Sequence, residues 1–124
     1  MEQTSYTQWS YTKPYLLLAI LVFALIFVNA YSDLHDFWRY ERVSFLANPE
    51  QAIGHAFIHL NAQHLSLNLI GLIALFSLFS TAFQTSSWLL ALLVSAIGSS
   101  LGLYYFSVQT EWCVGLSGAL HGLA

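Results

Sequence analysis

The chain has 124 residues, of which 57% are hydrophobic and only 7% are charged, and its formal net charge is −3. A soluble domain carries about 25% charged residues, so this composition is that of a membrane protein. Three basic residues are too few for a nucleic-acid surface, and a single cysteine excludes a disulfide scaffold and a cysteine-based zinc site. The length accommodates at most about four membrane spans of ~20 residues each.

The first apolar run is predicted to be a membrane helix over residues 14–31, preceded by a polar segment over residues 1–13. A secretory signal peptide is the competing interpretation, because Val28-Asn29-Ala30 resembles a small-residue cleavage site. The apolar run is longer than a usual signal core, and its leader carries only one lysine. We therefore favour an uncleaved helix.

A polar loop that leads to the next helix is predicted over residues 32–63, with room for a short interfacial helix. The loop holds six of the nine charged residues, which are Asp33, Asp36, Arg39, Glu41, Arg42 and Glu50. One basic residue precedes the first span and two follow it, so the positive-inside rule slightly favours a cytoplasmic loop.

The long uncharged stretch that follows, residues 51–110, divides at a polar turn over residues 84–87. Membrane helices are predicted on either side, over residues 64–83 and 88–106, and the short turn makes them antiparallel. Gly98 and Gly102 form a G-x-x-x-G pattern, which predicts the close approach of a neighbouring helix unless these glycines are chance small residues.

The last segment, residues 114–124, is predicted to begin a fourth membrane helix. A helix from Ser117 to Ala124 would extend roughly 12 Å, less than half of the ~30 Å hydrocarbon core. A terminal carboxylate inside the membrane is costly, so we expect the fold to continue beyond Ala124. The predicted fold class is all-α and polytopic, with three spans and the start of a fourth.

Two polar clusters lie near the starts of the second and fourth segments. His64 and Asn68 are four residues apart and share one helical face, and Ser117 lies between Gly115 and Gly118. Since one span separates the two helices, both clusters are expected in the same leaflet. A serine that faces a histidine and an asparagine is a candidate nucleophile with oxyanion donors. The structural alternatives are a capping serine, a histidine bound to a loop and an asparagine that bridges helices.

These motifs resemble those of the rhomboid intramembrane serine proteases. The matching residues are the G-x-S-G motif Gly115-Leu116-Ser117-Gly118, the H-x-x-x-N motif His64 and Asn68, and the upstream histidines His55 and His59. The resemblance covers residues 54–124 well and residues 1–49 only in topology. The sequence GLSGALHG also looks like the rhombosortase branch, whose members are implicated in processing proteins with a GlyGly-CTERM tail.

The resemblance implies that Ser117 is the nucleophile and that its backbone N–H, His64 and Asn68 stabilise the oxyanion. The family's general base is a histidine on a sixth span, beyond Ala124. His121 lies one turn after Ser117, and we expect it to pack or to line the site rather than to act as the base. The implied partners are the lipid bilayer and a membrane-anchored protein cut near its surface, with no nucleic acid and no cofactor. The expected location is a cell membrane, crossed several times, of the bacterial inner-membrane type.

Other function classes stay open at this point. An inactive rhomboid-like fragment or pseudoprotease would bind membrane helices without cutting them. A small haem or metal subunit would use His55, His59 and His64, although histidines at a membrane interface more often form hydrogen bonds to loops. Cys113 is interpreted as a small apolar residue rather than as a second nucleophile, because nothing near it in sequence would lower its pKa.

Overall fold

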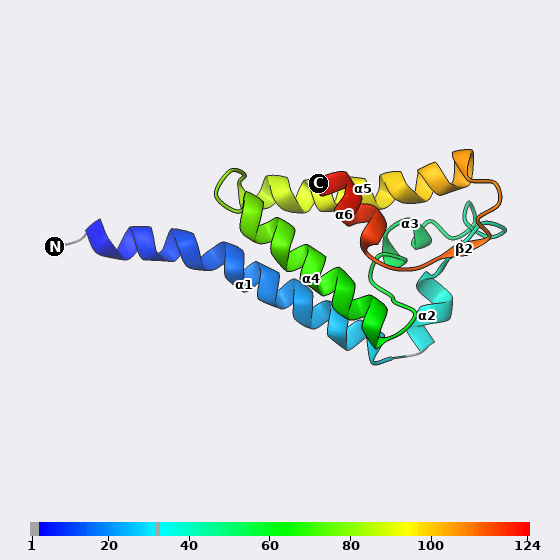
Figure 1. The fold of residues 1–124 in the computed structure, drawn as a ribbon, viewed down its shortest axis with the longest axis horizontal. Helices are drawn as coiled ribbons and strands as arrows, with labels where there is room; N and C mark the ends of the chain where they lie inside the picture. Colours follow the sequence, from blue (N-terminus) through cyan, green and yellow to red (C-terminus); the bar gives the residue numbers. More distant parts are fainter. Residues whose placement is uncertain (1–2, 32) are drawn as a thin grey trace.

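The computed structural model describes residues 3–31 and 33–124, with side chains from residue 13 onward. The helices are α1 (Gln3–Asn29), α2 (Asp33–Trp38), α3 (Gln51–Gly54), α4 (Ala62–Phe79), α5 (Thr85–Phe106) and α6 (Ser117–Leu123). Two short strands are β1 (Tyr40–Glu41) and β2 (Trp112–Cys113). In Figure 1, α1 lies beside α4, α4 and α5 form a hairpin, α6 runs along α5, and α2, α3 and the two strands gather at one end.

The helix α6 packs against both members of this hairpin, more extensively against α5 than against α4. The core draws one or more buried side chains from each long helix and from α6: Leu25, Leu72, Phe76, Trp88, Leu92, Ala96, Leu116, Ala119 and Leu120. Burial of these apolar groups is what brings distant segments of the chain together. The first turn of α6 is therefore held within the bundle rather than at its edge.

The hairpin helices begin slightly earlier than predicted, and polar residues at their starts explain the shift. Asn61 has an extended backbone, and its side-chain Oδ1 accepts a hydrogen bond of 2.9 Å from the N–H of His64. This N-cap allows α4 to begin at Ala62 instead of residue 64. The helix α5 begins at Thr85, inside the predicted polar turn, because serine and threonine are well tolerated in a first helical turn.

The first helix differs most from its predicted bounds. The segment 1–13 was expected to be polar and separate from the span, but α1 is continuous from Gln3 to Asn29 and contains Pro14. The φ angle that proline imposes is compatible with a helix. Proline destabilises a helix only because it lacks the backbone N–H and because its ring clashes with a carbonyl of the preceding turn. Polar composition alone therefore did not mark a helix boundary here.

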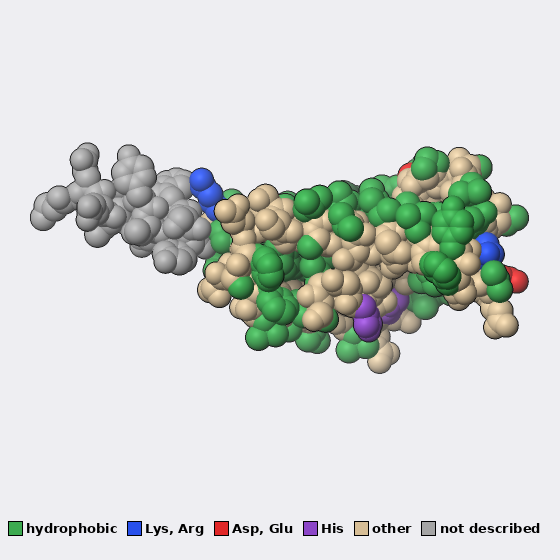
Figure 2. Space-filling model, turned by 90° about the horizontal axis from the view of Figure 1, so that it is seen from above, with side chains coloured by type: hydrophobic (Ala, Val, Ile, Leu, Met, Phe, Trp, Pro, Cys, Tyr) green, Lys and Arg blue, Asp and Glu red, His purple; other side chains and the backbone are tan. Residues whose placement is uncertain are grey.

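Two helices, α4 and α5, are long and apolar enough to cross a membrane by length and composition, and the apolar part of α1, Lys13–Asn29, is shorter. Large apolar side chains project outward along these helices, including Leu67, Leu78 and Leu90, each more than 60% exposed. Such faces suit contact with lipid. On the face shown in Figure 2, charged side chains gather toward the two ends and apolar groups lie between them.

Gly98 and Gly102 form no close helix contact within the described part of the chain, which agrees with the alternative that they are chance small residues. No described atom lies within 4 Å of the position that a Cβ would take at either glycine, so both face open space. Spacing of small residues indicates that a close approach is sterically allowed, and it does not identify which helix face is used.

The close helix contact is formed instead by glycines of α6 and serines of α5. A Cβ at Gly118 would lie 2.8 Å from both Cβ and Oγ of Ser99, and a Cβ at Gly122 would overlap the side chain of Ser95. The two glycines are four residues apart on α6, and the two serines are four residues apart on α5. This small-x-x-x-small spacing lets two backbones approach closely. We call these four residues the α5–α6 seam.

The polar segment 32–63 contains more regular structure than the predicted loop. It holds α2, β1 and α3, and β1 pairs with β2 in an antiparallel register of Tyr40 with Cys113 and Glu41 with Trp112. Strands of two residues carry no alternation of apolar and polar side chains, so the sequence gives no signal for them. The pairing connects this segment to the residues that lead into α6.

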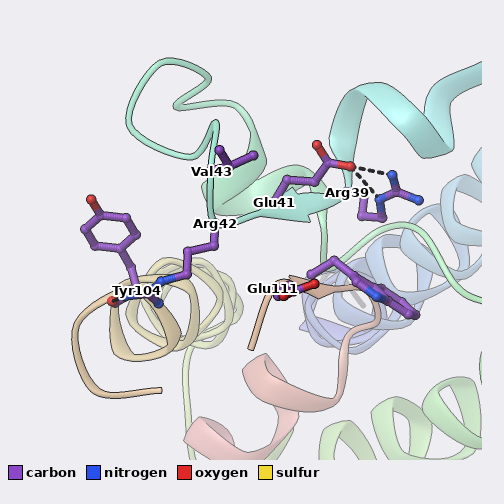
Figure 3. Close-up of a pocket in the computed structure, with 7 residues that line it drawn as sticks. Arg39, Glu41, Arg42, Val43, Tyr104 and Glu111 are labelled. Atoms are coloured by element: carbon purple, nitrogen blue, oxygen red, sulfur yellow. Dashed lines mark hydrogen bonds and ion pairs between the residues drawn. The ribbon is translucent and has the colours of Figure 1, made fainter. Parts of the chain in front are cut away.

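Arg42 follows β1 and caps the C-terminal end of α5. Its Nη2 donates to the carbonyl of Tyr104 at 2.7 Å, and its Nη1 donates to the carbonyls of Leu103 and Ser107 at 3.1 and 3.3 Å. The guanidinium also lies 5.1 Å from the centre of the Tyr104 ring. Figure 3 shows Arg42 reaching this helix end while Arg39 turns away toward Glu41. A cation at a helix C-terminus satisfies carbonyls that lack intrahelical partners.

We expect Arg42→Ala to lower the free energy of unfolding in detergent micelles by about 2 kcal/mol, because it removes charge-assisted bonds to three carbonyls. Arg39→Ala is the matched control. Arg39 pairs with Glu41 and Asp36 on a more exposed surface, where such pairs contribute less than about 1 kcal/mol. Denaturant titration of both variants measures the difference, and equal losses would contradict the capping role.

Candidate active site

The loop before α6 is held by the histidine-rich segment that precedes α4. The N–H of Gly115 donates to the carbonyl of His55 at 2.8 Å. The next N–H, that of Leu116, donates to Nε2 of His59 at 3.4 Å. Two successive backbone groups before Ser117 are therefore fixed by residues nearly sixty positions earlier in the chain.

Both anchoring histidines are buried, and their rings contact backbone groups. Nδ1 of His55 lies 2.9 Å from the carbonyl of Gln51, which can only accept a hydrogen bond. Burial lowers the pKa of His55, and burial followed by the nearby His64 lowers the pKa of His59 to about 4. These contacts confirm the interpretation of loop hydrogen bonds. Among the described residues, no group of three His, Cys, Asp or Glu side chains is placed to hold a metal.

Gly115 lies directly against the ring of His64. A Cβ at Gly115 would lie 2.6 Å from Cε1 and 2.8 Å from Nε2 of that ring, which is closer than real contacts allow. The backbone φ of Gly115 is +111°, a region that side-chain-bearing residues rarely adopt. Glycine is therefore required at position 115 for two reasons: the backbone has a positive φ, and the imidazole of His64 leaves no room for a side chain.

The His64 ring presents its Nε2 edge to this loop and is partly buried. Its Nδ1 is buried and has no hydrogen-bond partner among the described residues. The ring also stands edge-on to His59, with 5.1 Å between the ring centres. Contact with Gly115 on one side and with His59 on the other restricts the imidazole to this orientation.

Asn68 is buried one turn after His64 on the same face of α4. Its Nδ2 donates to the carbonyl of His64 at 3.0 Å, which uses one of its two amide N–H groups. Asn68 also lines a shallow cavity of about 260 Å³ together with Ser117, His121 and apolar residues of α4 and α6. A carbonyl oxygen bound in this cavity could receive the second N–H of Asn68.

Ser117 and His121 lie on the exposed side of α6. Nδ1 of His121 donates to the backbone carbonyl of Ser117 at 2.7 Å rather than to its hydroxyl. Among the side chains that the structure describes, none forms a hydrogen bond with the hydroxyl of Ser117. The position of His121 agrees with a residue that lines the cavity, and Gly118 packs away from the cavity against Ser99.

Cys113 is half-buried in β2, and its environment does not activate it. Burial raises the pKa of the thiol, with a smaller opposing effect from the carbonyl of Val114. A raised pKa leaves little thiolate at neutral pH, so nucleophilic attack by this sulfur is disfavoured. This agrees with its interpretation as a small apolar residue.

The rhomboid domain family matches residues 48–124, which is more than half of the chain. The chain belongs to the rhomboid family. The matched region contains both the H-x-x-x-N and the G-x-S-G residues, as well as the two anchoring histidines. Members of this family are typically serine proteases that act within membranes. No curated protein and no solved structure is significantly similar to this chain.

One residue that contacts the site was missed in the sequence. Asn29, at the end of α1, accepts the N–H of His59 at 2.7 Å with its Oδ1 and donates to the carbonyl of Phe57 at 2.8 Å. In the sequence, Asn29 stands out only as part of the Val28-Asn29-Ala30 pattern. The available signal was a single amide side chain at the end of an otherwise apolar run, which is costly unless it has hydrogen-bond partners.

We expect Gly115→Ala to lower the free energy of unfolding by about 2 kcal/mol or more, because the new Cβ meets the His64 ring at a strained φ. Gly98→Ala is the matched control. Its Cβ enters open space in the middle of α5, where alanine is favoured over glycine by up to about 1 kcal/mol. Unfolding titrations in detergent should therefore move in opposite directions, and a neutral Gly115→Ala would disprove the contact.

The depressed pKa of His59 predicts that acid destabilises the fold. The unfolded chain takes up a proton near pH 6.5, whereas the folded ring does so only near pH 4. Between these values the unfolded state binds more protons, so the free energy of unfolding falls by about 1.4 kcal/mol per pH unit from this group. Unfolding titrations at several pH values should show this slope, and His59→Gln, which does not titrate, should reduce it. An unchanged slope in the variant would contradict the assignment to His59.

Proposed function

We propose that the protein is an intramembrane serine endopeptidase of the rhomboid type, with Ser117 as its nucleophile. The observation that carries the proposal is the meeting of the two motifs, with Gly115 against His64 and with Asn68 and Ser117 in one cavity. Separate structural roles for these residues would not require them to meet. Membership in the rhomboid family provides the second support.

In the proposed reaction the hydroxyl oxygen of Ser117 attacks a peptide carbonyl and gives up its proton to a general base. The oxyanion is stabilised by the backbone N–H of Ser117, by the side-chain N–H of Asn68 and by an N–H at Nε2 of His64. The leaving amine takes a proton from the base, and water then hydrolyses the acyl-enzyme. By resemblance, the base is the family's histidine on a later span, since His121 is bonded to a backbone carbonyl.

The proposed substrate is a membrane-anchored protein cut near the bilayer surface. Ser117, Asn68 and His64 lie at the starts of their helices, close to the polar end that carries β1 and β2. A cavity at this depth is reached by water and by the end of a substrate helix. The resemblance of GLSGALHG to the rhombosortase branch makes proteins with a GlyGly-CTERM tail the proposed class. We propose a multi-pass location in a cell membrane of the bacterial inner-membrane type, with α1 as a third span.

A second candidate function is helix binding without cleavage. The observation in its favour is that no described side chain forms a hydrogen bond with the Ser117 hydroxyl. A serine without a base is a weak nucleophile at its ordinary pKa. A rhomboid-like pseudoprotease would use the same cavity and the same exposed apolar helices to hold a membrane segment.

The deciding experiment uses the protein in liposomes with a reporter domain fused, through a Gly-Gly junction, to a single transmembrane helix. Release of the reporter is expected from the wild type and none from Ser117→Ala. Asn68→Ala should lower kcat by about 10²–10³-fold, as loss of one oxyanion donor does in other acyl-transfer enzymes. Cys113→Ala is the control variant and should keep full activity.

Binding of the same helix is measured alongside cleavage, by fluorescence transfer between the labelled helix and the protein. Under the protease proposal, Ser117→Ala binds the helix but does not cut it. A wild type that binds without releasing the reporter would establish the pseudoprotease function instead.

A further inference from the structure

The side chain of Asn29 forms hydrogen bonds that connect the end of α1 with the segment before α4. Its Nδ2 donates to the carbonyl of Leu25 in its own helix at 2.7 Å and to the carbonyl of Phe57 at 2.8 Å. Its Oδ1 accepts the N–H of His59 at 2.7 Å. One amide side chain therefore closes the end of α1 and fixes both ends of the short turn that carries His59.

The ring of His59 transmits this constraint to the loop before Ser117. It is 2% exposed, and its Nε2 accepts the N–H of Leu116, the residue that immediately precedes Ser117. An imidazole nitrogen can accept only when it is unprotonated, so acceptance at Nε2 puts the proton of the neutral ring on Nδ1. This Nδ1 is bonded to the Phe57 carbonyl and lies 3.4 Å from Nδ2 of Asn29. Leu116 is itself 2% exposed, so its N–H has no access to water as an alternative acceptor.

We propose that Asn29 is a positioning residue that acts through His59 to hold the Leu116 N–H, and thereby the backbone of Ser117, in the geometry required for attack. This role rests on the proposed function of Ser117 as the nucleophile. Asn29 lies in α1, outside the residues matched by the rhomboid family.

The hydrogen bonds that connect Asn29, His59 and Leu116 involve only neutral groups. A positive charge on His59 would therefore disrupt them. The titratable groups that face His59 are His64 from α4 and His35 from α2. A proton on Nε2 would remove the acceptor of Leu116, and burial opposes that proton. Replacing the Asn29 amide with a carboxylate would favour it, because an anion beside the turn stabilises a charged ring.

The test measures amide hydrogen exchange at Leu116 in the whole protein, together with reporter cleavage in liposomes. His59→Phe keeps a ring but has no acceptor, so exchange at Leu116 should rise and kcat should fall by about tenfold or more. KM should stay within about twofold, since the substrate cavity is not altered. His59→Gln offers a carbonyl oxygen at a similar reach and should restore both quantities. Asn29→Ala should behave like His59→Phe.

Asn48→Ala is the matched control, because Asn48 also donates to a backbone carbonyl four residues earlier but contacts neither His59 nor Leu116. It should leave both measurements at the wild-type values. If Asn29→Ala does not fold, His59→Phe still tests the connection, because it leaves the bonds of Asn29 to backbone groups in place. Asn29→Asp keeps the acceptor for the His59 N–H but loses the donor to the carbonyls of Leu25 and Phe57. It should raise the pH at which Leu116 loses protection by about one unit, which a purely structural role would not do.

The outcomes separate this inference from the proposed function. If the wild type cleaves and exchange at Leu116 is unchanged in Asn29→Ala and His59→Phe, the positioning role is wrong and the protease proposal stands. If the wild type does not cleave but exchange at Leu116 responds as expected, the protease proposal fails while the hydrogen-bond connection is established. Unchanged pH dependence in Asn29→Asp would also overturn the positioning role.

Discussion

The contact between the Gly115 backbone and the His64 ring is the constraint on which the rest of the site depends. It exists only because Gly115 has no side chain and adopts a positive φ. The two N–H groups that flank this bend are directed at His55 and His59, and Ser117 follows directly. A side chain at position 115 would overlap the ring of His64, so the loop before Ser117 could not keep this distance from α4.

The polar end of the molecule also holds the loop before Ser117 in place. Pairing of β1 with β2 holds the chain just before Gly115, and Arg42 attaches this region to the last carbonyls of α5. The loop before α6 is thus fixed at both ends, by strand pairing at one and by the histidines at the other. A loop with so few free backbone groups can present a serine in a defined orientation.

The sequence predicted the features that depend on composition and on chemistry close in the chain. The helix over 88–106 largely coincides with α5, because uncharged apolar runs leave few alternatives. The meeting of His64 with the G-x-S-G segment followed from counting spans, and Gly115 does contact His64. The roles of Arg42 and Asn29 could not be predicted, because their partners are backbone carbonyls and amides, which are the same at every position. The helix face used by the small residues could not be predicted for a related reason, since spacing alone does not identify the partner helix.

The α5–α6 seam constrains how this part of the protein can vary in sequence. Where two backbones approach so closely, the side chains at facing positions share one small volume. An enlargement at Ser95 must be matched by a small residue at position 122, and the same holds for Ser99 and position 118. The serine and glycine positions therefore behave as two coupled pairs. Whether a larger side chain is tolerated at one position depends on the residue that faces it on the other helix. Substitutions on the face of α5 that packs against α6 can in this way displace Ser117 without contacting it.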